Sequence, residues 1–210
     1  MHHFALGAKG LVAQAAGDLE AAQAIFDRRL LLTRELSPGF FGMALTDCLD
    51  CAWRRRDYAR LLTAWEEFPI EVARLRLSGQ VGVLSILLLA LSSQEDSSRA
   101  VVAFRKLSQI LKLASEFEPW IINCFASFSL ACGDPALAAD IMAKGEHLEA
   151  RSKRHRARID RKTTAEILAR IEQNFLRAAR DRTLPLSLSE MLLRCAQHAD
   201  RIEAGAQQKL

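Results

Sequence analysis

The chain has 210 residues, of which 50% are apolar and 26% charged, and its net charge at pH 7 is +4. This composition excludes an intrinsically disordered chain, and the length excludes two large domains. Strands need many turns, but only ten glycines and five prolines are present. The sequence therefore predicts an all-α protein with long helices joined by short loops.

The N-terminal residues 1–4 carry no basic stretch followed by an apolar stretch, so no secretory signal is expected. The most apolar run, residues 81–91, is about half of the roughly 20 residues that a membrane span needs. The five cysteines are odd in number and lie mostly among apolar neighbours, which is typical of reduced thiols. We expect a soluble, cytoplasmic protein without disulfides.

An aspartate recurs at predicted turns with spacings of 39, 39 and 38 residues, at Asp18, Asp57, Asp96 and Asp134. Four residues after each aspartate stands a small or apolar residue, and four residues further a large apolar one. In chain order these pairs are Ala22 and Phe26, Leu61 and Trp65, Ala100 and Phe104, Ala138 and Met142. Aspartate is a favoured N-cap of helices. The pattern predicts the same helix–turn–helix unit four times.

The helix before each turn carries its own register, with small or apolar residues eight and five positions before the aspartate. These residues are Gly10 and Ala13, Leu49 and Ala52, Leu88 and Leu91, Ala126 and Ser129. They allow two antiparallel helices to approach closely. The predicted helices span residues 3–16, 18–35, 39–54, 57–68, 71–93, 96–115, 118–132 and 134–149.

The register stops near residue 149, and two capping-box patterns follow it. Thr163 with Glu166, and Ser187 with Glu190, each precede apolar residues at helical spacing. We expect two terminal helices, at residues 152–182 and 187–206, that cap the array. The predicted organisation is a repeat array over residues 1–149 and a basic helical cap over residues 150–210. The apolar stripe of the last helix is also compatible with a homodimer.

With Gly10, Gly17–Asp18, Ala22 and Phe26 in the first unit and Gly133–Asp134 and Ala138 in the fourth, the chain resembles the tetratricopeptide repeat family. The resemblance covers roughly residues 4–148, although that family's period is about 34 residues. It implies an α-solenoid of about four antiparallel helical hairpins. It also implies that the first helix of each hairpin lines a concave groove that binds a peptide or helix of another protein.

Carried over by register, the expected groove residues are Thr46, Asp50, Trp53, Arg54, Ser85, Leu89, Ser92, Trp120, Asn123 and Ser127. Tryptophan is enriched among residues that dominate binding energy, so Trp53 and Trp120 are the preferred anchors. The alternative for both is packing between hairpins. The groove makes a protein-binding scaffold the leading functional hypothesis.

One segment makes the chain basic. Residues 151–182 contain eleven Lys and Arg against four Asp and Glu. The predicted basic patch consists of Arg151, Lys153, Arg154, Arg156, Arg158, Arg161 and Lys162. Such a patch is typical either of a solvated helix face or of a site for an anionic partner, such as nucleic acid or acidic lipid.

No catalytic motif is visible in the sequence. Cys48 and Cys51 form the only C-x-x-C pair, and no second pair supplies the four ligands of a zinc site. We expect both to be buried thiols, with no metal and no cofactor, and we expect the chain not to be an enzyme. The remaining alternative is an accessory solenoid of a larger enzyme or regulatory system.

Overall fold

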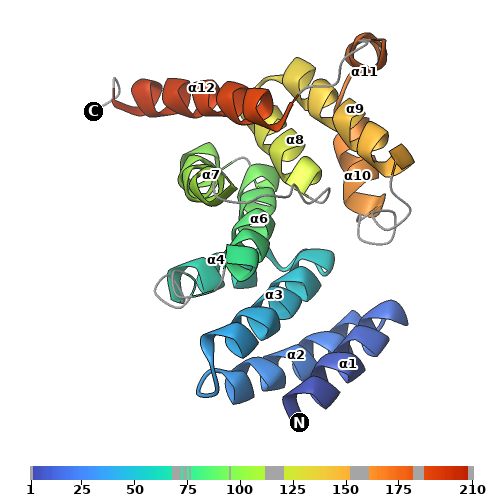
Figure 1. Cartoon of the computed structure of the whole chain (residues 1–210), viewed down its shortest axis with the longest axis vertical. Coiled ribbons are helices and arrows are strands. Elements are labelled where there is room, and N and C mark those ends of the chain that lie inside the picture. The colour runs from blue at the N-terminus through green and yellow to red at the C-terminus, as the bar shows by residue number, and fades with distance from the viewer. Residues whose placement is uncertain are drawn as a thin grey trace. The chain divides into compact units, whose positions relative to one another are not determined.

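The computed structural model describes residues 2–67, 72, 75, 77–94, 96–111, 121–151, 161–181 and 187–207. Over these residues the protein has eleven α-helices and no strand (Figure 1), which confirms the all-α prediction. None of the described helices combines the length and the apolar character needed to cross a membrane. The chain forms two compact units, Met1–Ala90 and Leu91–Leu210.

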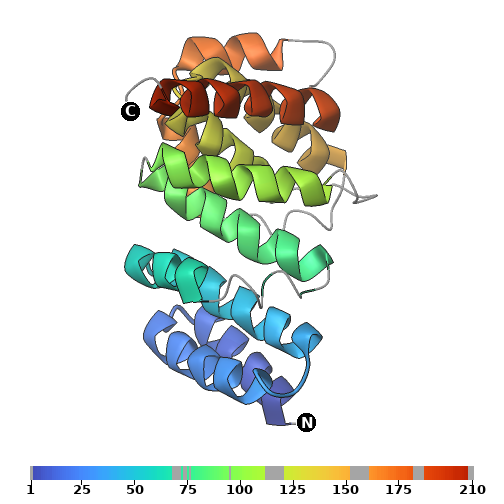
Figure 2. The ribbon, with the colours of Figure 1, turned by 90° about the vertical axis from the view of Figure 1, so that its left-hand side faces the viewer.

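The first unit contains α1 (His2–Ala15), α2 (Leu19–Thr33), α3 (Pro38–Arg54), α4 (Tyr58–Glu67) and most of α6 (Leu77–Ser93). Within it, α1, α2 and α3 lie side by side (Figure 1 and Figure 2), and α4 packs on α3. Its core joins Ala22 and Phe26 of α2 to Cys48 and Cys51 of α3. Gly10 of α1 is required here, because a Cβ at this position would lie 2.4 Å from the Phe26 ring.

The second unit contains α7 (Ser97–Leu111), α8 (Ile121–Ala131), α9 (Pro135–Arg151), α10 (Arg161–Ala169), α11 (Gln173–Arg180) and α12 (Leu188–Gln207). Phe104 of α7 stacks on Phe128 of α8 at 4.8 Å between ring centroids. Helix α9 packs on α8, α10 packs on α8, and α11 packs on α9. Helix α12 packs on α7 and α8.

The four predicted turns share the same hydrogen bonds. Each aspartate side chain accepts from the backbone N–H three residues later, at Ala21, Arg60, Arg99 and Leu137, over 3.0, 3.1, 3.1 and 2.8 Å. Each aspartate N–H donates to the carbonyl five residues earlier, at Ala13, Ala52, Leu91 and Ser129, over 3.0, 2.9, 3.1 and 2.9 Å. The second bond is the C-terminal closure of the preceding helix. These local turns are confirmed.

The backbone and burial at the turns follow the register. The residue before the aspartate has positive φ at Gly17, Arg56 and Gly133, as the helix closure requires. Four residues after the aspartate, Ala22, Leu61, Ala100 and Ala138 are fully buried. Eight residues after the aspartate, Phe26, Phe104 and Met142 are buried too. The Trp65 side chain, at the same position of the second turn, lies outside the described residues.

The C-terminal region differs from the prediction of one helix over residues 152–182. The described part divides into α10 and α11. The N–H groups of Arg170 and Ile171 donate to the carbonyls three residues earlier, at Ile167 and Leu168, and these tight turns end α10. Glu172 is then extended, with ψ of 142°. Thr163 lies inside α10 and is buried, so its predicted cap role is wrong.

The second capping box is confirmed. The Ser187 N–H donates to Glu190 Oε2 at 2.8 Å, and the Glu190 N–H donates to Ser187 Oγ at 3.2 Å. These reciprocal bonds start α12. The described helices beyond residue 150 pack on α7, α8 and α9. The boundary predicted at residue 149 stays a prediction.

Candidate functional site

A cavity of about 740 Å³ opens beside α3 in the first unit. It is lined by Ser37, Pro38, Gly39, Phe40, Gly42, Met43, Thr46, Asp47, Leu75 and Gly79. Its position follows from how α3 begins. Ser37 caps the helix by accepting from the Phe40 N–H at 3.3 Å, and Pro38 follows where its missing N–H costs nothing.

Glycines bring the cavity walls close together. A Cβ at Gly42 would lie 2.8 Å from Leu75 Cδ2, so a larger residue at 42 would push Leu75 away. Gly79 lies next to the same leucine, at 3.4 Å from its Cβ. At Gly39 the geometry is the opposite, since an added Cβ would meet only Ser37 Oγ, at 4.0 Å, among the described atoms. A Cβ at 39 therefore meets open space, and position 39 belongs to the cavity lining.

The walls are largely apolar and partly open. Met43 is 50% exposed, as expected of a side chain beside an unfilled cavity. The Phe40 ring contacts Phe4 edge-on at 5.5 Å and His3 at 4.5 Å, so α1 supports this end of the wall. Phe4 is itself 51% exposed. This rim offers exposed apolar side chains on two neighbouring helices.

One carboxylate faces the cavity. Asp47 forms an ion pair with Arg29 of α2. The Arg29 side chain is almost fully buried, whereas the Asp47 carboxylate is partly exposed and lines the cavity. Burial raises the pKa of the Asp47 carboxyl above its ordinary value, although the Arg29 guanidinium opposes the shift. Arg29 in turn packs against Gly7, where a Cβ would lie 2.9 Å from the guanidinium. The charged part of the site is thus anchored in the core.

Three of the predicted groove residues lie accessibly on α3. Thr46 lines the cavity, and its hydroxyl donates to the Gly42 carbonyl at 2.8 Å. Asp50 accepts from Gln14 at 2.9 Å and from Arg54 at 2.8 Å, and both partners of the ion pair are partly exposed. The structure therefore brings Thr46 to the cavity and leaves Asp50 and Arg54 on the same helix.

Trp53 does not fit the role of anchor. Its side chain is 3% exposed, with Tyr58 edge-on at 5.9 Å and the Arg56 guanidinium 4.4 Å from its ring centroid. It therefore packs at the end of α3 against residues of its own hairpin, whereas the alternative prediction was packing between hairpins. Trp120, the other predicted anchor, lies outside the described residues.

The other predicted groove residues are buried, namely Ser85, Leu89, Ser92, Asn123 and Ser127. Of the ten residues that line the cavity, sequence reasoning predicted only Thr46 and missed the other nine, including Phe40, Met43, Asp47 and Leu75. Met43 and Asp47 could have been found from the same register, since they stand fourteen and ten residues before Asp57. No sequence signal marks Leu75.

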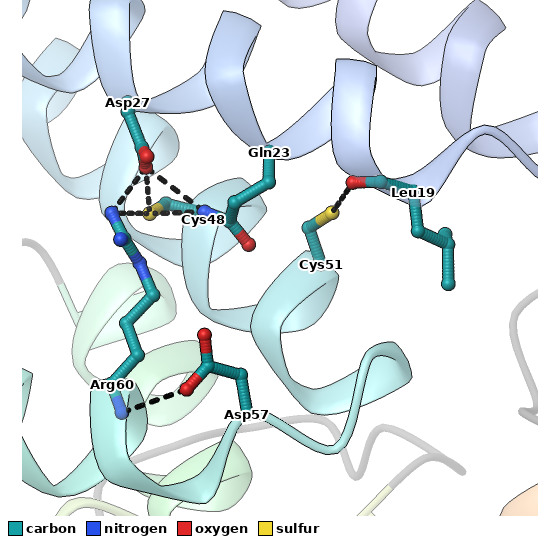
Figure 3. A network of polar contacts seen from close by, with 7 residues as sticks. All are labelled: Leu19, Gln23, Asp27, Cys48, Cys51, Asp57 and Arg60. Carbon is teal, nitrogen blue, oxygen red and sulfur yellow. Dashed lines mark hydrogen bonds and ion pairs between the residues drawn. The ribbon is translucent and has the colours of Figure 1, made fainter.

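The C-x-x-C pair is part of a partly buried network between α2, α3 and α4 (Figure 3). The Cys48 thiol donates to Asp27 Oδ1 at 3.2 Å, and Gln23 and Arg60 donate to the same oxygen. The Cys51 thiol donates to the Leu19 carbonyl at 3.5 Å. Burial raises the pKa of both cysteines to about 11, so they are protonated at neutral pH. Both are structural thiols, as predicted.

In the described part of the chain, no group of three or more His, Cys, Asp or Glu side chains could hold a metal ion. All five cysteines are free. His198 of α12 is buried and lies 2.7 Å from Asp134, the fourth turn aspartate. This contact joins α12 to the start of α9.

The basic patch cannot be placed from the described residues. Residues 152–160 lie outside them, and so do the side chains of Arg151 and Arg161. Lys162 is exposed at the start of α10. Binding of nucleic acid or acidic lipid by this segment stays a prediction.

Comparison with known proteins yields no match: no family model, no curated protein and no solved structure is similar to this chain.

Proposed function

We propose that this chain is a tetratricopeptide-like helical-repeat protein that holds a segment of another protein against α3. The contact site is the cavity described above, whose walls include Phe40, Met43, Thr46, Asp47 and Leu75. The observation that carries the proposal is the exposed apolar rim around an open cavity on the first helix of a hairpin. Apolar walls with few polar groups are typical of binding sites.

The repeat architecture is supported by the four aspartate turns. They share one hydrogen-bond pattern and recur at nearly constant spacing, as expected of stacked units that each bury their apolar faces on neighbours. An α-solenoid is the arrangement we propose for them. Proteins of this kind bind extended or helical segments through side chains of their first helices.

The polar groups of the cavity favour a specific fit. Thr46 offers a hydroxyl oxygen and Asp47 a partly exposed carboxylate, both beside Phe40 and Met43. A partner segment would therefore place an apolar side chain in the cavity and a donor group near Asp47. This site takes the place of Trp53 in the sequence-based hypothesis, while the role of Trp120 stays a prediction.

Filling the cavity tests the proposal. Gly39→Leu adds a side chain at a position of the cavity lining where a Cβ meets only Ser37 Oγ, at 4.0 Å, and replacing a helical glycine is expected to stabilise α3. Gly205→Leu is the matched control, because a Cβ at that position of α12 meets no described atom within 4 Å. Both variants are expected to fold.

The measurement uses peptides selected from a displayed random library on the wild-type chain. Their affinities for the wild type and both variants are then determined by fluorescence anisotropy. Selected peptides should bind the wild type and Gly39→Leu should weaken them strongly, while Gly205→Leu leaves them unchanged. Equal binding by Gly39→Leu would show that the cavity is not the contact site.

A further inference from the structure

Helix α1 lies at one edge of the first unit, where it packs on α2 and α3 (Figure 1). Its buried residues are His3, Leu6, Gly7 and Gly10. The opposite side of the helix is exposed and apolar, and we name it the α1 stripe. The stripe consists of Phe4, Ala5, Ala8, Leu11, Val12 and Ala15. These residues recur at spacings of three and four, so they share one helix face.

The α1 stripe carries no charge. Lys9, beside the stripe, is the one formally charged residue among residues 2–15. By contrast, the exposed residues of α12 include Glu190, Asp200, Arg201 and Glu203, which is typical of a helix face that water covers. The α1 stripe therefore does not have the composition of a solvated helix face.

The exposed area of the α1 stripe is large for a monomer. Phe4, Leu11 and Val12 are 51%, 50% and 69% exposed. Three large apolar side chains that are exposed by half or more present on the order of 300 Å² to solvent, and the three alanines add to this area. Apolar patches of about 300–600 Å² are the largest that ordinary monomers expose, and they often mark interaction sites. We therefore expect a partner surface to cover the stripe.

The order of residues in the α1 stripe favours a second copy of the same stripe as that surface. When two such helices pack antiparallel around Ala8, residue 8 meets residue 8 of the copy, residue 4 meets residue 12, and residue 5 meets residue 11. Phe4 then packs on Val12 of the copy, and the small Ala5 receives Leu11. The small Ala8 at the centre lets the two helices approach closely. A polar or charged partner would instead lose its hydration without gaining a hydrogen bond or an ion pair from the stripe.

We propose that two copies of this chain associate through their α1 stripes, with the helices antiparallel and Ala8 on the two-fold axis. Both copies then use the same surface, as in a two-fold symmetric homodimer. The two stripes together bury less than the roughly 1,200 Å² of a standard stable interface. The dimer is therefore weak and reversible.

Sedimentation velocity of the full chain over a range of concentrations tests the association. The wild type should shift reversibly from monomer to dimer as its concentration rises. Val12→Glu should raise the dissociation constant of the dimer by about tenfold or more, because a charge replaces an apolar side chain that both copies bury. Leu193→Glu is the matched control, since Leu193 of α12 is also exposed, at 60%, and this variant should keep the wild-type dissociation constant. Both substitutions are at exposed positions, so unchanged circular dichroism is expected.

Cysteine crosslinking tests the antiparallel register. In the proposed dimer residue 8 lies opposite its own copy, whereas residue 15 lies about 21 Å from its copy along the helix axis, at a rise of about 1.5 Å per residue. A disulfide needs Cα atoms within about 7 Å of each other. Diamide, which takes two electrons and two protons from a pair of thiols, should therefore crosslink Ala8→Cys and not Ala15→Cys. The wild-type chain gives the background from its own five free cysteines.

Three results would overturn the proposal. One is a chain that stays monomeric at every concentration up to about 1 mM, where even a weak dimer would be populated. Another is a dimer that Val12→Glu leaves intact, because it would form through another surface, such as α12 if Leu193→Glu removes it. The last is a crosslink in Ala15→Cys, which would indicate parallel helices or another register. The substituted residues do not line the α3 cavity, so these results are independent of the proposed function.

Discussion

The fourth turn aspartate has two structural roles, and its replacement should cost more stability than replacement of the first. Asp134 Oδ1 caps α9 by accepting from the Leu137 N–H, and its Oδ2 contacts His198. An ionised carboxylate only accepts, so His198 Nε2 is the donor. Asp18 caps α2 in the same way, and in the described residues it makes no equivalent contact with another helix.

The expected magnitudes follow from these contacts. Loss of an aspartate N-cap costs about 1 kcal/mol. Loss of a hydrogen bond to a charged group costs a further ~1.5–3 kcal/mol, and solvent screens it little because His198 is only 7% exposed. Asp134→Ala should therefore lower the free energy of unfolding by about 2.5–4 kcal/mol and Asp18→Ala by about 1 kcal/mol.

The assay combines urea unfolding, followed by far-UV circular dichroism, with hydrogen exchange of the α12 amides. Protection of the α12 amides should fall in Asp134→Ala and stay unchanged in Asp18→Ala, because of these two aspartates it is Asp134 that bonds to a residue of α12. Equal losses of stability in the two variants, with α12 protection intact in both, would refute the assignment of a second role to Asp134.

The same contact predicts a dependence on pH. Burial alone would raise the pKa of Asp134, but the hydrogen bonds from Leu137 and His198 outweigh it and hold the pKa below its ordinary 3.8. A pKa lowered in the folded state means that Asp134 stabilises the fold above 3.8 and loses this effect as the pH falls through the lower folded value. The stability difference between wild type and Asp134→Asn should shrink in that acidic range. A constant difference down to full protonation would contradict the shift.

Two further predictions concern the first unit. Gly10→Ala should destabilise it by about 1–3 kcal/mol, measured by urea unfolding, because the new Cβ would overlap the Phe26 ring; Gly39→Ala is the control with room for its Cβ. Cys48 and Cys51, with pKa values of about 11, should resist a thiol reagent at pH 8 in the native chain and react after unfolding. Rapid native labelling of either, located by peptide mass, would contradict their role as buried donors.

The turns could be predicted from the sequence because their chemistry is local. The hydrogen bonds that form the turns at Asp18 and Asp134 reach no more than five residues along the chain, so the aspartate and the preceding glycine carry the signal for the turn. The burial of Ala22 and Phe26 followed from their spacing after the aspartate. Helical periodicity and capping were thus sufficient for most of the elements.

The candidate site could be predicted only in part, because it depends on which side chains neighbouring helices cover. Thr46 and Asn123 stand at the same register position, but Thr46 lines the cavity beside Gly82 of α6, whereas Asn123 is buried and bonded to Thr164 of α10. Trp53 has the composition of an anchor but is covered by Tyr58 and Arg56, and no periodicity reveals this. The contribution of Leu75 to the cavity likewise depends on the glycines that approach it.

The short reach of the turn bonds has a consequence for the order of folding. Closing a loop of a few residues costs little chain entropy, so each helix pair can form from its own segment. During synthesis the chain emerges from the ribosome N-terminus first, and α1 and α2 need only residues up to Thr33 to make the Asp18 turn and pack Phe26 against Gly10. Structure can therefore accumulate while the rest of the chain is still being made, and each new helix meets a surface that already exists.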